Sequence, residues 1–273
     1  MPFEAPSSLP PGHRNFLEAL VRRLPSDERL VGVAAGGSYL TDAMDPYSDL
    51  DLVVAVEPSA FGQVMEDRKQ IAATLGPLLA SFTGEHVGEP RLLICLYGEP
   101  LLHVDLKFVA LGDAAQRVED PAILWERGSR FSEALRGGRA EYPMPDPTWI
   151  EDRFWIWIHY AVTKIGRGEL FEALDFLAFL RTFVLGPLAA VRAGARPTGV
   201  RRLEVVDPEF ARELQQTLAR HDARDCLRAV DACAELYRDL RAHANAVEPQ
   251  AEAEAAAMGY LRRIGAKLGD AET

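Results

Sequence analysis

The sequence is poor in cysteine and has no long uninterrupted hydrophobic run. Its three cysteines are Cys95, Cys226 and Cys233. The last two lie seven residues apart in a segment of helical periodicity, too far along one helix to form a disulfide. The longest apolar stretch, residues 176–191, is interrupted by Arg, Gly and Pro, and the first 30 residues lack the regions of a signal peptide. We therefore predict a reduced, cytoplasmic protein with neither a membrane span nor an export signal.

Basic residues are also under-represented. The 273 residues include 30 Lys and Arg against 41 Asp and Glu, which gives a net charge of −11. Such a chain repels long nucleic acids and anionic membranes. Hydrophobic residues make up 48% of the chain, enough for one large or two medium cores. Small or cationic partners are therefore expected, and both a monomer and a homodimer are compatible with the sequence.

The sequence pattern changes from mixed α/β to helical at a proline-rich segment, residues 141–147. Before this segment, short β-rich runs alternate with helical periodicity, which predicts an α/β (α+β) domain with a small mixed sheet over residues 1–145. After this segment no further β-rich runs occur, and residues 146–273 are expected to form an all-α helical bundle. The expected strands are residues 30–35, 50–56, 91–97 and 102–109, and the expected helices of the first half are residues 14–24 and one or two within residues 61–82.

Amphipathic segments follow one another in the second half. The first carries an apolar stripe from Ile150 to Ile165, and Gly166 to Gly168 are expected to end it. Within this stripe Trp157 is expected to be a core residue, whereas Trp155 and Tyr160 are candidates for stacking on a ring. Further helices are predicted at residues 169–191, 208–220, 223–244 and 251–268.

The most informative segment begins where the first expected strand ends. Gly36, Gly37 and Ser38 follow that strand. Glycines allow the backbone to approach a ligand closely, and a following helix start offers unpaired N–H groups to an anion. These three residues are therefore candidates for holding phosphates.

Three aspartates extend the pattern. Asp49 and Asp51 lie at a spacing of two, so both carboxylates point to the same side of a strand, and Asp105 arises in a later strand pattern. Clustered carboxylates are costly without a cation, and oxygen ligands of this kind suit Mg²⁺. The combination of a glycine turn and three strand-borne acids is what nucleotidyl transfer requires.

This pattern resembles the DNA polymerase beta-like nucleotidyltransferase superfamily, whose signature is Gly-Ser, a spacer, Asp-x-Asp/Glu and a later strand Asp. The segment Pro46-Tyr47-Ser48-Asp49 looks like the branch of antibiotic nucleotidyltransferases, similar to kanamycin, streptomycin and lincosamide enzymes. Residues 123–128 look like the acidic-basic turn of the streptomycin adenylyltransferase group. The motif match covers residues 33 to 109, and the helical half resembles these enzymes in architecture alone.

The resemblance implies an enzyme that transfers a nucleoside monophosphate, AMP from ATP above all, to a hydroxyl of a small molecule such as an aminoglycoside-like antibiotic. In that mechanism Gly37 and Ser38 hold the β- and γ-phosphates, while Asp49, Asp51 and Asp105 are catalytic and bind two Mg²⁺ ions. Asp105 binds the second ion, takes the hydroxyl proton, or does both. Lys164 is placed near the triphosphate because related enzymes have a basic residue there.

The helical domain is expected to bind the acceptor. Glu169 and Glu172 share one flank of a helix and would attract a cationic acceptor, although a solvated helix face is the simpler explanation of both. A rival reading is a regulatory nucleotidyltransferase of the toxin–antitoxin type, acting on a protein or RNA. Its sequence support is Arg238 and His243, which fit an Arg-x4-His pattern of helical ribonucleases.

Overall fold

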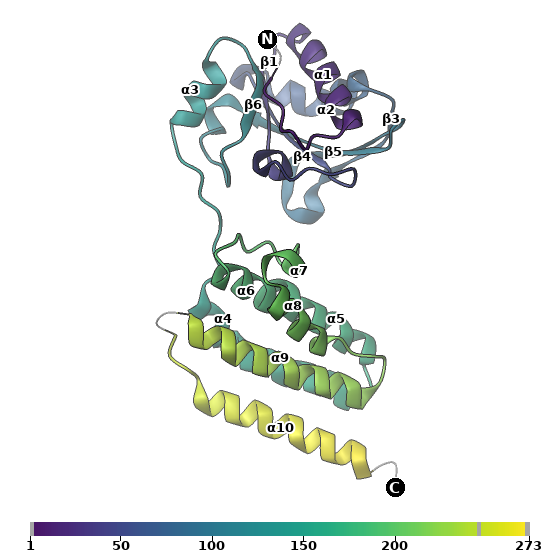
Figure 1. The fold of residues 1–273 in the computed structure, drawn as a ribbon, viewed down its shortest axis with the longest axis vertical. Coiled ribbons are helices and arrows are strands. Elements are labelled where there is room, and N and C mark those ends of the chain that lie inside the picture. The colour runs from purple at the N-terminus through teal and green to yellow at the C-terminus, as the bar shows by residue number, and fades with distance from the viewer. Residues whose placement is uncertain (1–2, 245–246, 271–273) are drawn as a thin grey trace. The chain divides into compact units, whose positions relative to one another are not determined.

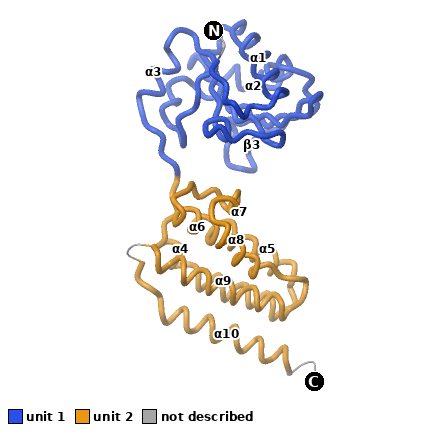
Figure 2. The backbone as a smooth tube through the Cα atoms, in the orientation of Figure 1, with its two compact units in different colours: residues 1–142 blue, residues 143–273 orange. Residues whose placement is uncertain are grey.

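The computed structural model describes residues 3–244 and 247–270. The chain forms two compact units, residues 1–142 and residues 143–273 (Figure 2). Their border lies close to the proline-rich segment at residues 141–147. Each unit is described by itself below.

The N-terminal unit is built on one six-stranded sheet with the strand order β3-β4-β5-β2-β1-β6 (Figure 1). β2 and β5 pair in parallel, and every other neighbouring pair is antiparallel. The sheet is therefore mixed, which confirms the predicted fold class. Its strands are β1 (Leu30–Ala35), β2 (Leu50–Val56), β3 (Leu78–Gly84), β4 (Glu89–Tyr97), β5 (Leu102–Ala110) and β6 (Ala122–Glu126).

One face of this sheet is covered by two helices, α1 (Pro11–Arg23) and α2 (Phe61–Leu75). Alternate residues of β2 and β5 point to this face, and Leu50, Leu52 and Leu106 are at most 2% exposed. They pack with Leu17 of α1 and Ala72 of α2 in one hydrophobic cluster. Strand period two thus accounts for the apolar half of each strand.

The opposite face is covered over part of its area. Phe131, from the short helix α3 (Arg130–Arg136), packs with Val31, Ala55 and Val109 in a second, smaller cluster. Gly32 makes room for it, since a methyl group there would lie 2.8 Å from the Phe131 ring. The charged residues of β2 and β5 point to the part of this face beyond that cluster.

Two segments differ from the sequence-based expectation. One or two helices were expected within residues 61–82, but α2 ends at Leu75, and β3 begins at Leu78 after Gly76-Pro77. The Gly-Pro pair ends the helix because proline disfavours helical backbone in the residue before it. Ile123 to Glu126, expected to form part of a turn, instead belong to β6 and pair with β1; the turn follows at Arg127 and Gly128.

The second unit is helical throughout its regular elements, as expected. The described helices are α4 (Pro147–Gly166), α5 (Leu170–Leu180), a π-helical turn η6 (Arg181–Leu185), α6 (Gly186–Arg192), α7 (Leu203–Val206), α8 (Pro208–Leu214), a 3-10 turn η7 (Gln215–Thr217), α9 (Ala223–His243) and α10 (Ala251–Asp270). Asp146 caps α4 by accepting from Thr148 N and Trp149 N, and Gly168, at φ +76°, reverses the chain beyond its end.

The core of this unit lies between α4, α5 and α9, and α10 packs against α4 and α9. Ile150, Phe154 and Ile165 are buried, as the apolar stripe predicts. The two tryptophans are exchanged relative to our expectation. Trp155 is 2% exposed and belongs to the core, whereas Trp157 is half-buried at the rim.

The continuous run Leu170–Arg192 is, among the described residues, the one helix long and apolar enough to cross a membrane by length and composition. The Arg, Gly and Pro residues that interrupt the run do not exclude it by this criterion, and the expected absence of a membrane span stays a prediction. Half of its most apolar window is buried inside the unit, and Leu177, Leu180 and Val184 belong to the helical core. A core helix of a soluble protein passes the same test.

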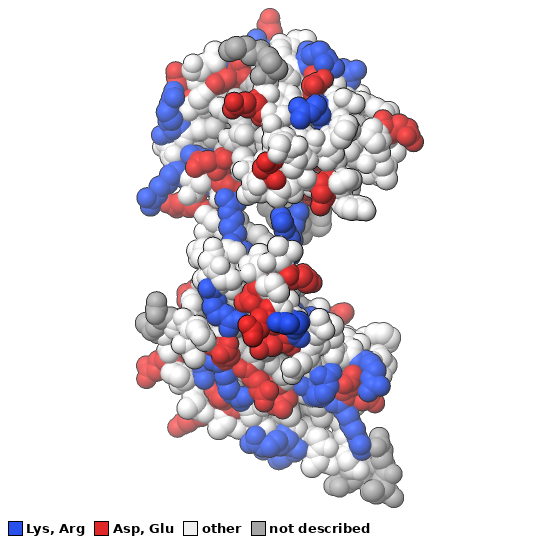
Figure 3. Space-filling view, in the orientation of Figure 1, with Lys and Arg blue, Asp and Glu red and all other residues white. Residues whose placement is uncertain are grey.

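Acidic and basic side chains are interspersed on the face of the molecule shown in Figure 3. Both kinds occur on both units there, and the face shows no continuous basic band outside the atoms drawn in grey. A basic band is what binding along a nucleic acid backbone requires.

Candidate functional site

The turn between β1 and β2 brings backbone amides to the first carboxylates. Gly36 N donates to the carbonyl oxygen of Asp51 at 2.8 Å, which fastens the turn to β2. Gly37 has φ +59°, and a side chain there would overlap Asp51 Oδ2. Only glycine fits at this position, because it lacks a Cβ and tolerates positive φ. Ser38 follows in the 3-10 turn η2 (Gly37–Thr41) and is half-buried.

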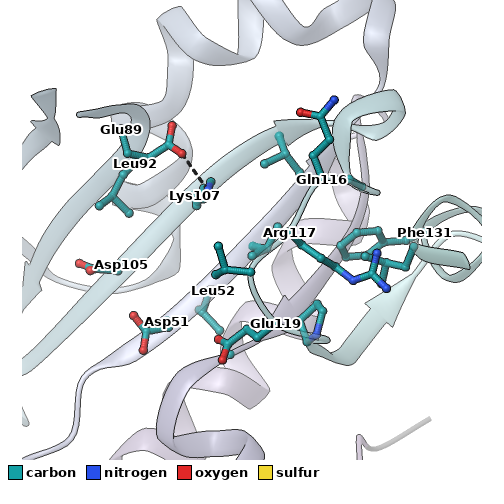
Figure 4. A pocket seen from close by; sticks show the side chains of 17 residues that line it. Asp51, Leu52, Glu89, Leu92, Asp105, Lys107, Gln116, Arg117, Glu119 and Phe131 are labelled. Carbon is teal, nitrogen blue, oxygen red and sulfur yellow. Dashed lines mark ion pairs between the residues drawn. The ribbon is translucent and has the colours of Figure 1, made fainter. Parts of the chain in front are cut away.

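Asp51 and Asp105 lie directly opposite each other on the parallel strands β2 and β5. Their side chains project to the same, open face of the sheet and stand side by side in Figure 4. Asp49 precedes the first residue of β2 and is half-buried. The structure therefore brings together the glycine turn and the aspartates that the sequence singles out.

The surroundings of Asp105 disfavour its ionised form. Burial raises the pKa of this carboxyl above its ordinary value, and the nearby charge of Asp49 acts in the same direction. His103 opposes them, since its Nε2 lies 2.9 Å from Asp105 Oδ1. The net effect is a raised pKa, as expected of a carboxyl that shares a site with another acid.

A pocket of about 350 Å³ extends from these acids across the open face towards α3. Its lining is largely apolar, with Leu92, Val109 and Phe131 among its walls (Figure 4). Two cationic side chains also line it, Lys107 of β5 and Arg117 of the loop after β5. The pocket thus runs from an acidic side to a side with positive charge.

Both cations have carboxylate partners. Lys107 Nζ lies 2.8 Å from Glu89 Oε2, and Arg91 Nε donates to Glu89 Oε1 at 2.7 Å. The hydrogen bond from Arg91, joined by Lys107, lowers the pKa of Glu89 to about 2. Arg117 Nε donates to Asp120 Oδ1 at 2.7 Å. An anion bound in the pocket would have to replace Glu89 and Asp120 as the partners of Lys107 and Arg117.

Glu119 is a site residue that sequence reasoning missed. It comes from the loop between β5 and β6, and its Oε1 accepts a hydrogen bond of 2.7 Å from Gly37 N. It lines the same pocket as Asp51 and Asp105 (Figure 4). A carboxylate therefore holds the amide that the sequence assigns to a phosphate. Nothing in the loop sequence signals this contact, because it joins residues 82 positions apart.

The donor chemistry of the acids fits a divalent cation, since carboxylate oxygens are the ligands that Mg²⁺ prefers. A cation beside Asp105 would lower the pKa of this carboxyl and so oppose the effect of the Asp49 charge, which raises it. Within residues 3–244 and 247–270, no three or more His, Cys, Asp or Glu side chains stand in an arrangement that could hold a metal ion. The three aspartates would have to close around an ion, and their role as metal ligands stays a prediction.

The other predicted site residues lie in the helical unit. Lys164 Nζ lies 2.6 Å from Glu169 Oε2 and 5.1 Å from the centre of the Tyr160 ring. Glu172 accepts a hydrogen bond of 2.6 Å from Tyr160 Oη. Lys164, Glu169, Glu172 and Tyr160 therefore form one local group on α4 and α5, and their predicted roles towards nucleotide and acceptor stay predictions.

The Arg-x4-His pattern of the rival reading lies on α9. Arg238 Nε donates to Glu254 Oε1 at 2.7 Å, and its guanidinium lies 5.5 Å from the centre of the Trp155 ring. His243 Nδ1 lies 2.8 Å from the carbonyl oxygen of Asp239. Arg238 thus joins α9 to α10, which is a structural role.

Comparisons with known proteins bear on the N-terminal unit. Residues 13–87 match the model of the nucleotidyltransferase domain family. The match contains the glycine turn, Asp49 and Asp51, and ends before Asp105. A search of curated proteins finds no match. Among solved structures, the chain is similar to an aminoglycoside 6-adenyltransferase from Bacillus subtilis, with 14% identity, 92% of this chain and 96% of that chain covered, and a TM-score of 0.42.

The family match covers the segment in which the turn and the first two acids are built, and so it bears directly on the site. It confirms, over residues 13–87, the resemblance to the nucleotidyltransferase superfamily that the motifs indicate.

Proposed function

We propose that this protein transfers a nucleoside monophosphate, AMP from ATP, to a hydroxyl of a small molecule in a metal-dependent reaction. The observation that supports this best is the placement of Asp51 opposite Asp105 on β2 and β5, next to the Gly36–Gly37 turn. Strands fix both carboxylates, and the turn supplies amides within reach of the same place. A site of this composition suits a triphosphate with its cations.

Asp49, Asp51 and Asp105 would hold the divalent cations. When bound, Mg²⁺ supplies neutralisation of the triphosphate charge. Burial, together with the nearby charge of Asp49, raises the pKa of Asp105, and a bound cation would favour its ionised form.

In the transfer itself, the acceptor oxygen forms a bond to the α-phosphorus, and the bond from that phosphorus to the bridging oxygen breaks. Pyrophosphate leaves, and the hydroxyl proton passes to the Asp105 carboxylate. His103 Nε2, at 2.9 Å, holds one oxygen of this carboxylate in place.

Gly37 and Ser38 would bind the β- and γ-phosphates. Because Glu119 accepts the Gly37 N–H, its carboxylate has to leave before a phosphate oxygen takes that hydrogen bond. Lys164 is the basic residue that we assign to the nucleotide. To bind a phosphate, it would have to give up its ion pair with Glu169.

The acceptor is proposed to bind through the helical unit. Glu172 accepts from the Tyr160 hydroxyl and Glu169 pairs with Lys164, so two carboxylates and an aromatic ring occur in one local group, a combination that suits a hydroxylated, cationic ring compound such as an aminoglycoside. Antibiotic resistance would follow if such a compound is the acceptor. The cytoplasmic location predicted from the cysteine content is part of this proposal.

Pyrophosphate release tests the proposal. The purified protein is incubated with Mg²⁺, each of the four nucleoside triphosphates, and a panel of aminoglycosides, lincosamides and simple hydroxylated metabolites. We expect release that depends on one acceptor and disappears in Asp49→Asn. Glu133→Gln, which neutralises an exposed acid on α3, serves as the matched control and should keep full activity.

Full activity in Asp49→Asn would contradict the role of the aspartates. If no compound of the panel causes pyrophosphate release while ATP still binds in a metal-dependent way, a protein or RNA acceptor is favoured, as in the regulatory hypothesis.

A further inference from the structure

The N-terminal segment, residues 4–13, lies along the loop that leads from the glycine turn to Asp49. Backbone and side-chain groups of the segment form hydrogen bonds with this loop. These bonds are Tyr39 Oη to Glu4 O at 2.8 Å, Ser7 Oγ to Asp42 Oδ2 at 2.7 Å, Ser8 N to Asp42 Oδ1 at 2.8 Å and Met44 N to Ser8 Oγ at 3.1 Å. The segment thus holds the first half of the loop against the unit.

His13 holds the other end of the same loop. It lies in the first turn of α1, is 3% exposed, and its Nε2 is 2.7 Å from the carbonyl oxygen of Ser48. A carbonyl oxygen only accepts, so Nε2 carries a proton and donates. Ser48 is the residue immediately before Asp49.

The loop between these two attachments has little packing of its own. Tyr47 is 95% exposed, and Asp45 and Pro46 are also exposed. Its internal hydrogen bonds are local, from Tyr47 N and Ser48 Oγ to Asp45 Oδ1. Local bonds of this kind shape a turn but do not fix it relative to the sheet.

The planarity of the peptide bond links His13 to Asp49. The carbonyl of Ser48 and the nitrogen and Cα of Asp49 lie in one plane. A hydrogen bond that fixes the Ser48 oxygen therefore also fixes the direction in which the chain enters Asp49. The buried α1 supports this bond, since Phe16, Leu17 and Leu20 pack the helix onto the sheet.

We propose that His13 is a positioning residue, which orients Asp49 for binding a divalent cation through the Ser48 carbonyl. This inference rests on the proposed function, because Asp49 is a metal ligand in that proposal. It goes beyond the proposal by assigning a role to a buried side chain that does not line the pocket.

The test compares three variants. His13→Leu removes the donor and keeps an apolar side chain, whereas His13→Gln keeps an N–H donor. Tyr97→Phe is the matched control, since it removes another buried donor, Tyr97 Oη to Ala72 O at 2.9 Å, from the same unit but away from the loop. Each variant is measured for the Mn²⁺ dissociation constant by electron paramagnetic resonance, for kcat, and for Tm.

We expect His13→Leu to weaken Mn²⁺ binding and lower kcat by about 10- to 100-fold, the usual range for a group that orients a metal ligand. His13→Gln should recover most of both losses. Tyr97→Phe should lower Tm by a similar amount to His13→Leu and leave Mn²⁺ binding and kcat unchanged.

Equal Mn²⁺ binding in His13→Leu and the unaltered protein would overturn the inference, as would parallel losses in His13→Leu and Tyr97→Phe. Absence of Mn²⁺ binding in the unaltered protein would overturn it as well. If the unaltered protein binds Mn²⁺ but releases no pyrophosphate with any acceptor, the proposed function fails, and the binding comparison still decides the role of His13.

Discussion

The surroundings of two acidic side chains, one in each unit, shift their pKa values in opposite directions. Asp105 has a raised pKa, because burial and the neighbouring Asp49 outweigh the contact with His103. Glu151, on α4, is 2% exposed and more completely buried, yet its pKa is lowered. Burial alone raises the pKa of a carboxyl, so the difference comes from the donors around each one.

Glu151 is surrounded by donors from α4, from α9 and from the residue that precedes α10. Its Oε1 accepts from Trp155 Nε1 at 3.1 Å, Arg241 Nη1 at 2.9 Å and Gln250 N at 2.8 Å, and its Oε2 accepts from Tyr237 Oη at 2.6 Å. These bonds offset the cost of burying the charge. An acid with this environment stabilises the fold, whereas an acid in the environment of Asp105 favours binding of a cation or a proton.

The largest expected effect is the loss of activity in Asp105→Asn. Removal of this carboxylate should lower kcat by at least about 1,000-fold, which corresponds to about 4 kcal/mol of transition-state stabilisation. Tm should stay equal or rise, because the charge removed is one that folding disfavours. Pyrophosphate release and thermal unfolding measure the two effects.

Leu106→Ala, one residue further along β5, is the matched variant on the covered face. Leu106 is 1% exposed, so the truncation should cost about 3 kcal/mol of stability while the folded fraction keeps its kcat. Should Asp105→Asn lose stability and keep activity, the contrast between the two acids would be wrong.

Glu151→Gln should show the opposite outcome to Asp105→Asn. Replacing Glu151 removes the closer of two carboxylate partners of Arg241, the one at 2.9 Å, and we expect a loss of about 3 kcal/mol. Pyrophosphate release per folded molecule should not change. Denaturant unfolding gives the free energy, and an unchanged midpoint would show that Arg241 finds compensation from Glu254, 3.1 Å away.

The same residue sets a pH dependence of stability. Because the folded pKa of Glu151 lies below its ordinary value of 4.5, its contribution is fully present above about pH 4.5 and is lost as the pH falls through the lowered folded value. The Tm difference between the unaltered protein and Glu151→Gln should therefore be constant from pH 7 to about 5 and shrink below about pH 4.5. A difference that persists undiminished at pH 3 would contradict this assignment.

The environment of Asp105 could be predicted from the sequence in large part, because it follows from strand geometry. Alternation in residues 50–56 and 102–109 places the acids on one face and the leucines on the other. The sequence does not fix strand order, so the parallel register of Asp51 with Asp105 appears only in the structure. Residues 78–82 were included in a helical segment because Leu79 and Phe82, exposed on the edge strand β3, mimic helical periodicity.

The network of Glu151 was not predicted, and neither was Glu119. Glu151 lies on the long apolar helix α4, and its partners Tyr237, Arg241 and Gln250 are more than 80 residues away in sequence. Glu119 stands in a loop without periodicity. Contacts that depend on tertiary packing leave no local pattern, whereas strands and helices do.

The smallest expected effect concerns Glu119, the acid that shares the pocket with Asp105. Glu119→Ala frees Gly37 N–H and removes a negative charge that would face a triphosphate. We expect the triphosphate concentration for half-saturation to fall about fivefold, equivalent to about 1 kcal/mol for one hydrogen bond. Glu133→Ala, on the exposed side of α3, controls for net charge and should leave this concentration unchanged. A rise in Glu119→Ala would mean that Glu119 contributes to nucleotide binding, and would group it with Asp105 as an acid that acts on the bound cation.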